Sequence, residues 1–582
     1  MKGPRGLALT VAAAAALSVT AVATPTALAA PELTAPELAE YTVLVEDGAD
    51  PAAARAAVES AGGTVLRENP AIGTLVVDAP AGGFVETVTA DGAVLGASHA
   101  RPVGRTPGAG PDTGGRGAER DHVEQEHRRG AQGGAAPGGG AGGGGAAAGL
   151  DPLDERLWGL ALVRAGAARG VQAGDDRVLV GILDSGIDGS HPDLAGNFDA
   201  ELSRNFAVDI PNDPNGAVVD GPCEVKGCLD PVDRDDSGHG THVAGTVAAA
   251  ADGFGVSGVA PGVTLVNIRG GQDAGLLFLQ PVVDALTYGA DIGLDVINMS
   301  FYVDPWLYNC IDNPADPPEA QIEQRTVIET VNRALRYAHR KGVTLVGSLG
   351  NNHEDLGRPR TDVSSPDYPF GQEYPRVIDN RTCVDLPVEG PHVIGVSALG
   401  PSGIKADYSN YGTEQISLAA PGGWFRDGFG TPGFSTLENL ILSTYPRSVL
   451  EADGDVAPDG TVTEQGVANG VQRACDDAGT CGYYAYLQGT SMASPHVTGV
   501  AALIVSEFGR PSRDGFGMAP DAVERILLRT AADRACPAPV LSYAREGRPA
   551  EFDAPCEGTT GFNGHYGEGV VDAFAAVTAP GR

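Results

Sequence analysis

Short apolar runs, separated by stretches with helical periodicity, fill the chain from residue 151 to residue 582. The runs are continuous rather than alternating, and the clearest lie at 178–183, 263–268, 296–299, 343–346 and 393–396. A continuous apolar run is typical of a strand buried on both faces, as in a parallel sheet. Such strands alternating with helices predict an α/β domain over 151–582, with a mainly parallel central sheet flanked by helices.

A second, smaller unit is predicted ahead of this domain, within residues 31–104. Its pattern changes from period two to helical period and back, which indicates a small α+β unit of the split βαβ kind. The expected strands lie at 41–45, 63–66 and 73–77, and the expected helices at 52–61 and near 83–90.

Residues 105–150 have a different composition. They are first polar and then rich in Gly and Ala, with seven glycines within 137–145 and no apolar periodicity. Such a segment cannot bury enough apolar surface to fold by itself. We therefore expect a flexible, protease-accessible linker between the two units.

The first 30 residues have the layout of a secretory signal peptide. Lys2 and Arg5 precede an apolar run at 7–22, and the small-residue pattern Ala-Leu-Ala-Ala-Pro follows at 27–31. A membrane-anchoring helix is the alternative, but the run is too short and too rich in Ala. No later segment offers about twenty uncharged apolar residues. The sequence predicts a secreted, extracellular product with no stable membrane anchor.

Charge and cysteine content agree with this compartment. The 582 residues include 39 Lys and Arg against 75 Asp and Glu, a net charge of −36, so an extended nucleic-acid-binding surface is not expected. Eight cysteines indicate disulfides. A zinc site is the alternative, but the sequence contains no Cys-x-x-Cys motif. Eight thiols allow 105 pairings, so the connectivity stays open. Three close pairs, 223/228, 475/481 and 536/556, are plausible local loops, which leaves Cys310 with Cys383.

Three motifs carry residues suited to nucleophilic catalysis. The motif Gly-Ile-Leu-Asp-Ser-Gly-Ile at 181–187 ends a buried strand in Asp184, although a turn residue is the simpler explanation. The motif Asp-Ser-Gly-His-Gly-Thr-His at 236–242 places His239 between glycines. Metal binding by His239 and His242 is the alternative, but an HExxH-type acidic partner is lacking.

The third motif, Gly-Thr-Ser-Met-Ala-Ser-Pro-His at 489–496, places Ser491 at the start of an apolar helix. The free N–H groups there can stabilise developing negative charge, whereas a plain helix cap is the alternative role. A hydroxyl, an imidazole and a carboxylate together are what an activated serine nucleophile requires.

In the order Asp184, His239, Ser491, these motifs strongly resemble those of the subtilisin-like serine peptidases. The resemblance covers most of 155–575 and ends with Gly-Glu-Gly-Val-Val-Asp-Ala at 567–573. It implies that Ser491 attacks the peptide bond, that His239 is the base and that Asp184 orients it. It also implies that 31–104 is a ferredoxin-like inhibitory propeptide, that the partners are protein or peptide substrates, and that the enzyme is a monomer.

The resemblance extends to the oxyanion hole and the substrate-binding cleft. Asn351, in Gly-Ser-Leu-Gly-Asn-Asn at 347–352, matches the family's oxyanion-hole amide, with Asn352 as the neighbouring alternative. The strand end at 300–302 is expected to pair with an extended peptide. The implied substrate-binding residues are Ser300, Phe301, Tyr302, Ser348, Leu349 and Gly350. Tyr302 stands where the family usually has Gly, so it either narrows the pocket or reshapes the edge strand.

Long insertions distinguish this chain from the family pattern. They lie at 303–325, at 352–390 and between Gly422 and Gly489, and they either restrict the substrates or merely elaborate the surface. No cofactor is required for the chemistry. Structural calcium is possible because Asp residues gather at 230–236 and at 188–193, but no ligands are assigned.

These observations predict a secreted serine endopeptidase, made as a self-processing preproenzyme. A catalytically silent binding protein on the same scaffold is the alternative from another class. A lipase or esterase of the α/β-hydrolase type is a third, but it needs Gly-x-Ser-x-Gly, and Ala493 occupies the last position.

Overall fold

The computed structural model describes residues 38–100, 123–130, 151–512 and 515–580. The predicted signal peptide, 1–30, and most of the predicted linker therefore lie outside the described residues. Within the described part of the chain, no helix combines the length and apolar character needed to cross a bilayer.

A seven-stranded parallel sheet forms the centre of the large domain, in the order β15-β14-β10-β8-β5-β7-β6. The predicted α/β fold is confirmed, because the buried apolar runs form strands of this one sheet. The strands are β5 (Leu179–Leu183), β6 (Arg204–Asn205), β7 (Thr264–Arg269), β8 (Val296–Met299), β10 (Thr344–Ser348), β14 (Val393–Leu399) and β15 (Leu418–Pro421).

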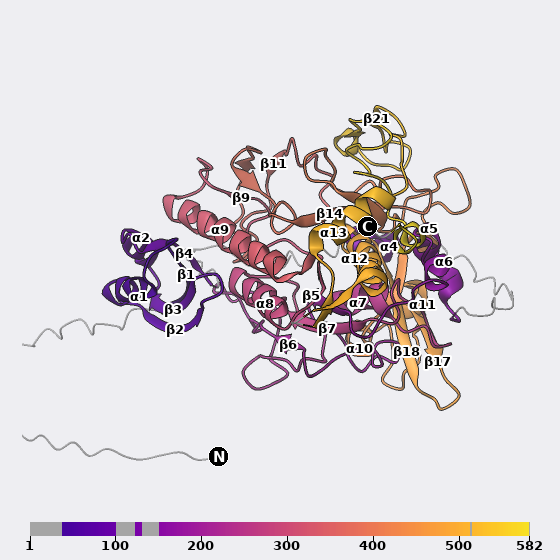
Figure 1. Ribbon diagram of the computed structural model, residues 1–582, viewed down its shortest axis with the longest axis horizontal. Helices are drawn as coiled ribbons and strands as arrows, with labels where there is room; N and C mark the ends of the chain where they lie inside the picture. Colours follow the sequence, from indigo (N-terminus) through magenta and orange to yellow (C-terminus); the bar gives the residue numbers. More distant parts are fainter. Residues whose placement is uncertain (1–37, 101–122, 131–150, 513–514, 581–582) are drawn as a thin grey trace, which may run out of the picture. The chain divides into compact units, whose positions relative to one another are not determined.

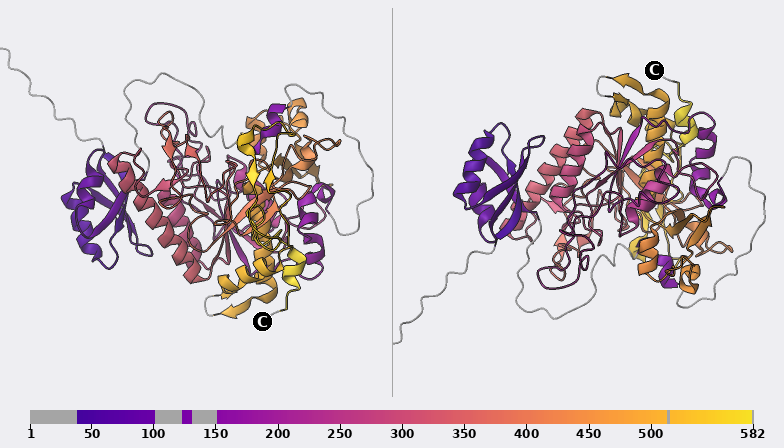
Figure 2. Two further views of the ribbon diagram at one scale, coloured as in Figure 1. Left: turned by 90° about the horizontal axis from the view of Figure 1, so that it is seen from above. Right: turned by 90° about the horizontal axis from the view of Figure 1, so that it is seen from below.

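Helices cover both faces of this sheet (Figures 1 and 2). Alternate strand residues point to opposite sides. Side chains such as Ile182 and Val346 pack with α7 (His239–Ala248) and α12 (Thr490–Phe508). Side chains such as Leu183 and Leu345 pack with α8 (Leu279–Asp291) and α9 (Pro318–Lys341). The two apolar layers hold the ends of the strands rigidly, which is what a site at the carboxyl edge of the sheet requires.

Shorter elements decorate this core. The helices are α5 (Trp158–Leu162), α6 (Ala165–Arg169), α10 (Arg447–Ala452), α11 (Glu464–Ala468), α13 (Pro520–Thr530) and α14 (Ala573–Val577). The insertion that precedes α12 carries an antiparallel sheet of β16 (Ile441–Thr444), β18 (Cys481–Leu487) and β17 (Gln472–Cys475). The remaining strand pairs are β9 (Asn309–Cys310) with β13 (Cys383–Val384), β11 (Thr361–Asp362) with β12 (Arg376–Val377), β19 (Arg510–Ser512) with β20 (Gly515–Gly517), and β21 (Val540–Leu541) with β22 (Ala554–Pro555).

The small N-terminal unit is an antiparallel sheet with two helices and its own apolar core. Its strand order is β2 (Thr64–Asn69), β3 (Thr74–Pro80), β1 (Leu38–Val45), β4 (Val94–His99), and its helices are α1 (Pro51–Ser60) and α2 (Phe84–Thr89). The three strands and two helices predicted here are present. β4 was not predicted, because its sequence Val-Leu-Gly-Ala-Ser-His has no clear alternation. That this unit is ferredoxin-like and inhibitory stays a prediction.

Residues 123–130 depart from the expected linker. They are helical, with α4 at Glu126–Gly130, and the side chains of Glu124 and His127 are buried. The Gly- and Ala-rich composition of the surrounding sequence concealed this short charged stretch. It binds mainly through polar contacts, and Val123 packs against the apolar core.

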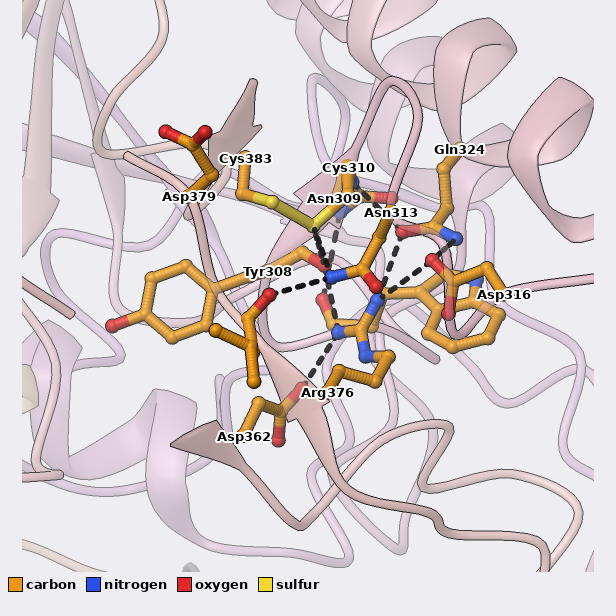
Figure 3. Close-up of a disulfide and its surroundings, with 12 residues drawn as sticks. Tyr308, Asn309, Cys310, Asn313, Asp316, Gln324, Asp362, Arg376, Asp379 and Cys383 are labelled. Atoms are coloured by element: carbon orange, nitrogen blue, oxygen red, sulfur yellow. Dashed lines mark hydrogen bonds and ion pairs between the residues drawn. A yellow bond between two sulfur atoms is a disulfide. The ribbon is translucent and has the colours of Figure 1, made fainter. Parts of the chain in front are cut away.

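Four disulfides join Cys223–Cys228, Cys310–Cys383, Cys475–Cys481 and Cys536–Cys556, and the described cysteines include no free thiol. Cys310–Cys383 ties the two insertions at 303–325 and 352–390 together (Figure 3). The same two insertions enclose Arg376, which is fully buried. Its guanidinium binds Asp362 at 2.6 Å, Asp316 at 3.3 Å and the carbonyl oxygen of Tyr308 at 2.9 Å (Figure 3).

Candidate active site

Asp184 and His239 are brought together by the carboxyl end of β5 and the first residue of α7. His239 Nδ1 lies 2.7 Å from Asp184 Oδ1, and the Asp184 side chain is almost fully buried. Gly240 makes this approach possible, because a Cβ there would lie 2.1 Å from the carbonyl oxygen of Gly186. The carboxylate can therefore hold one tautomer of the imidazole and direct Nε2 into the cleft.

The His239 ring is 20% exposed and lies between two carboxylates. Burial by itself would lower the pKa of His239, but the negative charges of Asp184 and Glu124 outweigh it and raise the pKa well above the usual value. This imidazole is consequently a stronger base than an isolated histidine, and its protonated form is stabilised.

Ser491 lies in the first turn of α12 and is buried. Its Oγ donates to the carbonyl oxygen of Ser300, 3.4 Å away. Asp184, His239 and Ser491 all line one cleft of about 580 Å³ at the carboxyl edge of the sheet. Two positions 307 residues apart in the sequence thus share a single cavity.

Asn351 follows β10 and lines the same cleft. Its side-chain oxygen accepts hydrogen bonds from Thr490 N at 2.9 Å and from Thr490 Oγ1 at 2.8 Å. With the oxygen held by the residue before Ser491, the amide NH₂ is left as the donor that faces the helix start. Asn352 also borders the cleft, but it is exposed and its backbone N–H is bound by Asn410.

Five of the six predicted substrate-binding residues line the cleft, and Leu349 does not. Phe301, Tyr302, Ser348 and Gly350 line the cleft. Ser300 also borders it, but its buried hydroxyl binds the carbonyl oxygen of Ser491 and Ser494 Oγ, so this side chain supports the start of α12. Leu349 departs from the prediction. Its fully buried side chain packs in an apolar cluster with Leu307 and does not line the cleft, because alternate residues after β10 point away from each other.

Tyr302 contacts one of the insertions. Its hydroxyl donates to Asp367 Oδ2 at 2.6 Å, and Ser364, Asp367 and Phe370 of the 352–390 insertion line the cleft as well. Tyr302 therefore reshapes the edge of the cleft by fastening an insertion to it. Part of the 352–390 insertion thus forms a wall of the cleft.

Comparison with known proteins gives the family. The model of the subtilase family matches residues 175–569, which is more than half of the chain and includes Asp184, His239 and Ser491. The chain belongs to the subtilase family. The subtilase region thus coincides with the domain built on the seven-stranded sheet.

Relatives within the subtilase family are distant. The chain is 27% identical over 389 residues to fervidolysin of Fervidobacterium pennivorans, which covers 66% of this chain and 41% of that protein. It is 26% identical to subtilisin DY of Bacillus licheniformis over 351 residues, 60% of this chain and 85% of that protein. For the nisin leader peptide-processing serine protease of Lactococcus lactis the identity is 28%, over 60% of this chain and 43% of the protein. The chain thus spans less than half the length of two of these three relatives.

Solved structures support the subtilase fold. The epidermin leader peptide processing serine protease of Staphylococcus aureus aligns with a TM-score of 0.57 at 18% identity, covering 94% of this chain and 99% of that one. Fervidolysin aligns with a TM-score of 0.54 at 22% identity, covering 94% of this chain and 61% of that one. At sequence identities this low, the structural similarity establishes a shared fold alone.

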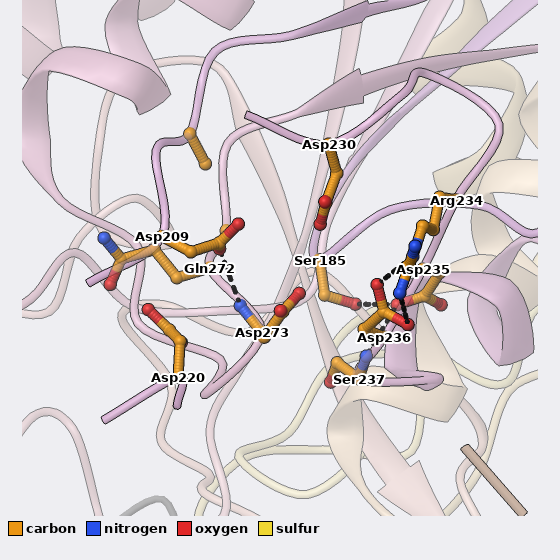
Figure 4. A network of polar contacts seen from close by, with 12 residues as sticks. Ser185, Asp209, Asp220, Asp230, Arg234, Asp235, Asp236, Ser237, Gln272 and Asp273 are labelled. Carbon is orange, nitrogen blue, oxygen red and sulfur yellow. Dashed lines mark hydrogen bonds and ion pairs between the residues drawn. The ribbon is translucent and has the colours of Figure 1, made fainter. Parts of the chain in front are cut away.

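The acidic cluster considered for calcium is already balanced by a cation of the protein. Arg269 is fully buried and binds Asp209, Asp230 and Asp273 at 2.9–3.0 Å. Nearby, Asp235 accepts hydrogen bonds from Ser185 Oγ and from backbone N–H groups, and Arg234 pairs with Asp236 (Figure 4). Arg269 thus balances part of this negative charge, and structural calcium stays a prediction without assigned ligands.

The sequence analysis missed one group of residues in the cleft. Val123, Glu124, Gln125 and Arg128 all line it, and Glu124 Oε2 lies 3.5 Å from His239 Nε2. The available signal was an island of charge, Glu-Gln-Glu-His-Arg-Arg at 124–129, within a Gly- and Ala-rich stretch.

Proposed function

We propose that this chain is a secreted serine endopeptidase that hydrolyses peptide bonds through Asp184, His239 and Ser491. The observation that carries the proposal is the 2.7 Å contact between His239 Nδ1 and Asp184 Oδ1, in a cleft that Ser491 also lines. A binding protein would have no need for a basic imidazole, held by a buried carboxylate, in the same cleft as a serine at a helix N-terminus.

The proposed reaction follows from the roles of these groups. His239 removes the proton of Ser491 Oγ, which attacks the scissile carbonyl and forms a tetrahedral oxyanion. The backbone N–H of Ser491 and the NH₂ of Asn351 donate to that oxyanion. His239 then protonates the leaving amine, and water hydrolyses the acyl-enzyme by the same steps in reverse, while Asp184 stabilises each imidazolium.

We further propose that the protein is made as a preproenzyme. Residues 1–30 are its signal peptide, 31–104 its inhibitory propeptide, 105–150 the segment in which it is cut, and 151–582 the peptidase. The compact core of the small unit supports the propeptide assignment. If a Ser491→Ala chain purified alone still lost the small unit, self-cleavage would be refuted.

Covalent labelling of Ser491 tests the proposed activity. After removal of residues 31–150, a fluorophosphonate probe is expected to label the parent chain and leave Ser491→Ala unlabelled, and only the parent is expected to hydrolyse casein. A processed parent chain that takes up no label would favour a catalytically silent binding protein.

A further inference from the structure

Residues 123–126 run alongside the polypeptide that leads into α12. Gln488 Nε2 donates to the carbonyl oxygen of Val123 at 2.8 Å, and Gln488 N donates to the carbonyl oxygen of Glu124 at 3.2 Å. Gln488 immediately follows β18 and lies three residues before Ser491. These two bonds fix the backbone of the segment beside the reaction centre.

The Glu124 side chain occupies the centre itself. Its carboxylate faces His239 Nε2 at 3.5 Å, on the opposite side of the ring from Asp184, and it is only 11% exposed. A Cβ on Gly489 would lie 3.0 Å from Glu124 Oε1 and 3.4 Å from Asn351 Nδ2. The carboxylate therefore lies between the imidazole and the oxyanion donor, where a reacting carbonyl would have to enter.

Two residues after Glu124, the carboxylate of Glu126 is bound in a pocket formed by Arg426, Arg548 and Gln488. Arg426 binds Glu126 Oε1 through Nε at 2.7 Å and through Nη2 at 2.6 Å, and Arg548 binds Oε2 at 2.9 Å. Gln488 Nε2 adds a contact at 3.2 Å. The pocket is itself anchored, because Arg548 Nε binds the buried carboxylate of Asp407 at 2.5 Å.

Arg128 continues the pattern with the opposite charge. Its guanidinium lies 3.1 Å from Asp453 and 3.3 Å from the fully buried side chain of Asp455. Between the two ion-pair sites, His127 is buried near the ring of Phe425, with 6.5 Å between the ring centres. An acid-x-acid-x-base pattern on the segment thus meets a complementary pattern on the large domain.

We propose that the insertion between Gly422 and Gly489, together with Arg548, forms a binding site for a peptide with the pattern Glu-x-Glu-x-Arg, and that residues 123–128 of this chain occupy it as a built-in inhibitor. The inhibitory role rests on the proposed function, whereas the binding site does not. It is distinct from the small unit at 31–104, because it acts through a side-chain carboxylate placed against His239.

Hydrogen exchange tests the binding site without relying on activity. The full-length Ser491→Ala chain, which cannot process itself under the proposed mechanism, is compared with the same chain carrying Arg426→Gln and Arg548→Gln. We expect peptides that span 123–130 to exchange slowly in the first chain and at least about tenfold faster in the second, given two ion pairs lost. The matched control is Arg447→Gln, which breaks an exposed pair with Glu451 in the same insertion. Fast exchange in the unsubstituted background, or protection unaffected by the two arginine changes, would overturn the site.

Labelling kinetics test the blocking role. In the otherwise native full-length chain, Glu124→Ala is expected to react with a fluorophosphonate at least about tenfold faster than the parent, and Glu126→Gln to react faster as its anchor is lost. Equal rates in parent and Glu124→Ala, before or after removal of 31–104, would overturn the block. If neither Glu124→Ala nor a parent chain freed of residues 31–150 is ever labelled, the proposed function is wrong, and hydrogen exchange still decides whether the segment binds.

Discussion

At the scale of single residues, the proposed chemistry depends on the contact between Asp184 and His239. The two residues are 55 positions apart, and each motif taken alone also fits a turn or a helix start. The resemblance to a family could identify them. The 2.7 Å contact required the fold, because it depends on where a strand end and a helix start meet.

Replacing the buried carboxylate is expected to disable the base. With Asp184→Asn, we expect kcat for a short peptide substrate to fall about 10⁴-fold, because the amide favours the wrong tautomer and cannot stabilise the imidazolium. The pKa of His239 should also fall, since one of the two charges that raise it is removed. At low pH, kcat/KM falls because the protonated form of His239 cannot act as a base. This acid limb of the profile should then move to lower pH. Asp188→Asn, outside this contact, is the control, and an unchanged kcat in Asp184→Asn would contradict the assignment.

Asn351, the proposed oxyanion donor, is the next residue to test. Asn351→Leu is expected to lower kcat about 10²–10³-fold with little change in KM, a magnitude known from the equivalent change in subtilisin. Asn352→Leu, at the exposed neighbouring position, should leave kcat within about twofold of the parent. Steady-state kinetics of both variants decide between the two asparagines, and the opposite result would assign the role to Asn352.

At the scale of elements, the buried Arg376 joins the insertions at 303–325 and 352–390. Arg376→Gln should lower the free energy of unfolding by about 3–5 kcal/mol, because Asp316 and Asp362 would be left as buried charges without their partner. Chemical denaturation measures this change. Arg381→Gln, which breaks a pair on an 85% exposed arginine, should have almost no effect. Similar losses in both variants would show that the insertion does not depend on this buried cation.

Element boundaries show how far local patterns reach. The run at 178–183 predicted β5, which is observed at Leu179–Leu183. A short continuous apolar run is typical of a strand that is buried on both faces of a parallel sheet. The helix at 123–130 could not be predicted in this way. Its short charged sequence is held by Arg426, Arg548 and Asp455, which lie about 300 or more residues further along the chain. Likewise, Leu349 was wrongly placed in the cleft because a motif does not reveal which side of the chain each residue faces.

At the scale of the whole molecule, the disulfides differ in the length of chain that they close. Removing Cys310–Cys383 with paired Ser substitutions should cost about 4 kcal/mol of stability, because its loop spans 73 positions. Removing Cys475–Cys481, with a span of 6, should cost about 2 kcal/mol. Thermal unfolding of the two double variants compares them. A larger loss from the short loop would show that native contacts, rather than loop closure, determine the effect.

The occupant of the Glu-x-Glu-x-Arg site is part of the same polypeptide as its receptor. A tethered ligand has an effective concentration in the millimolar range for short flexible connections, whatever the bulk concentration. Dispersal of the protein into a large extracellular volume would therefore not free the cleft between Asp184 and Ser491. Release would need a covalent cut or a competing peptide, so the onset of activity would follow one of these two events and be independent of dilution.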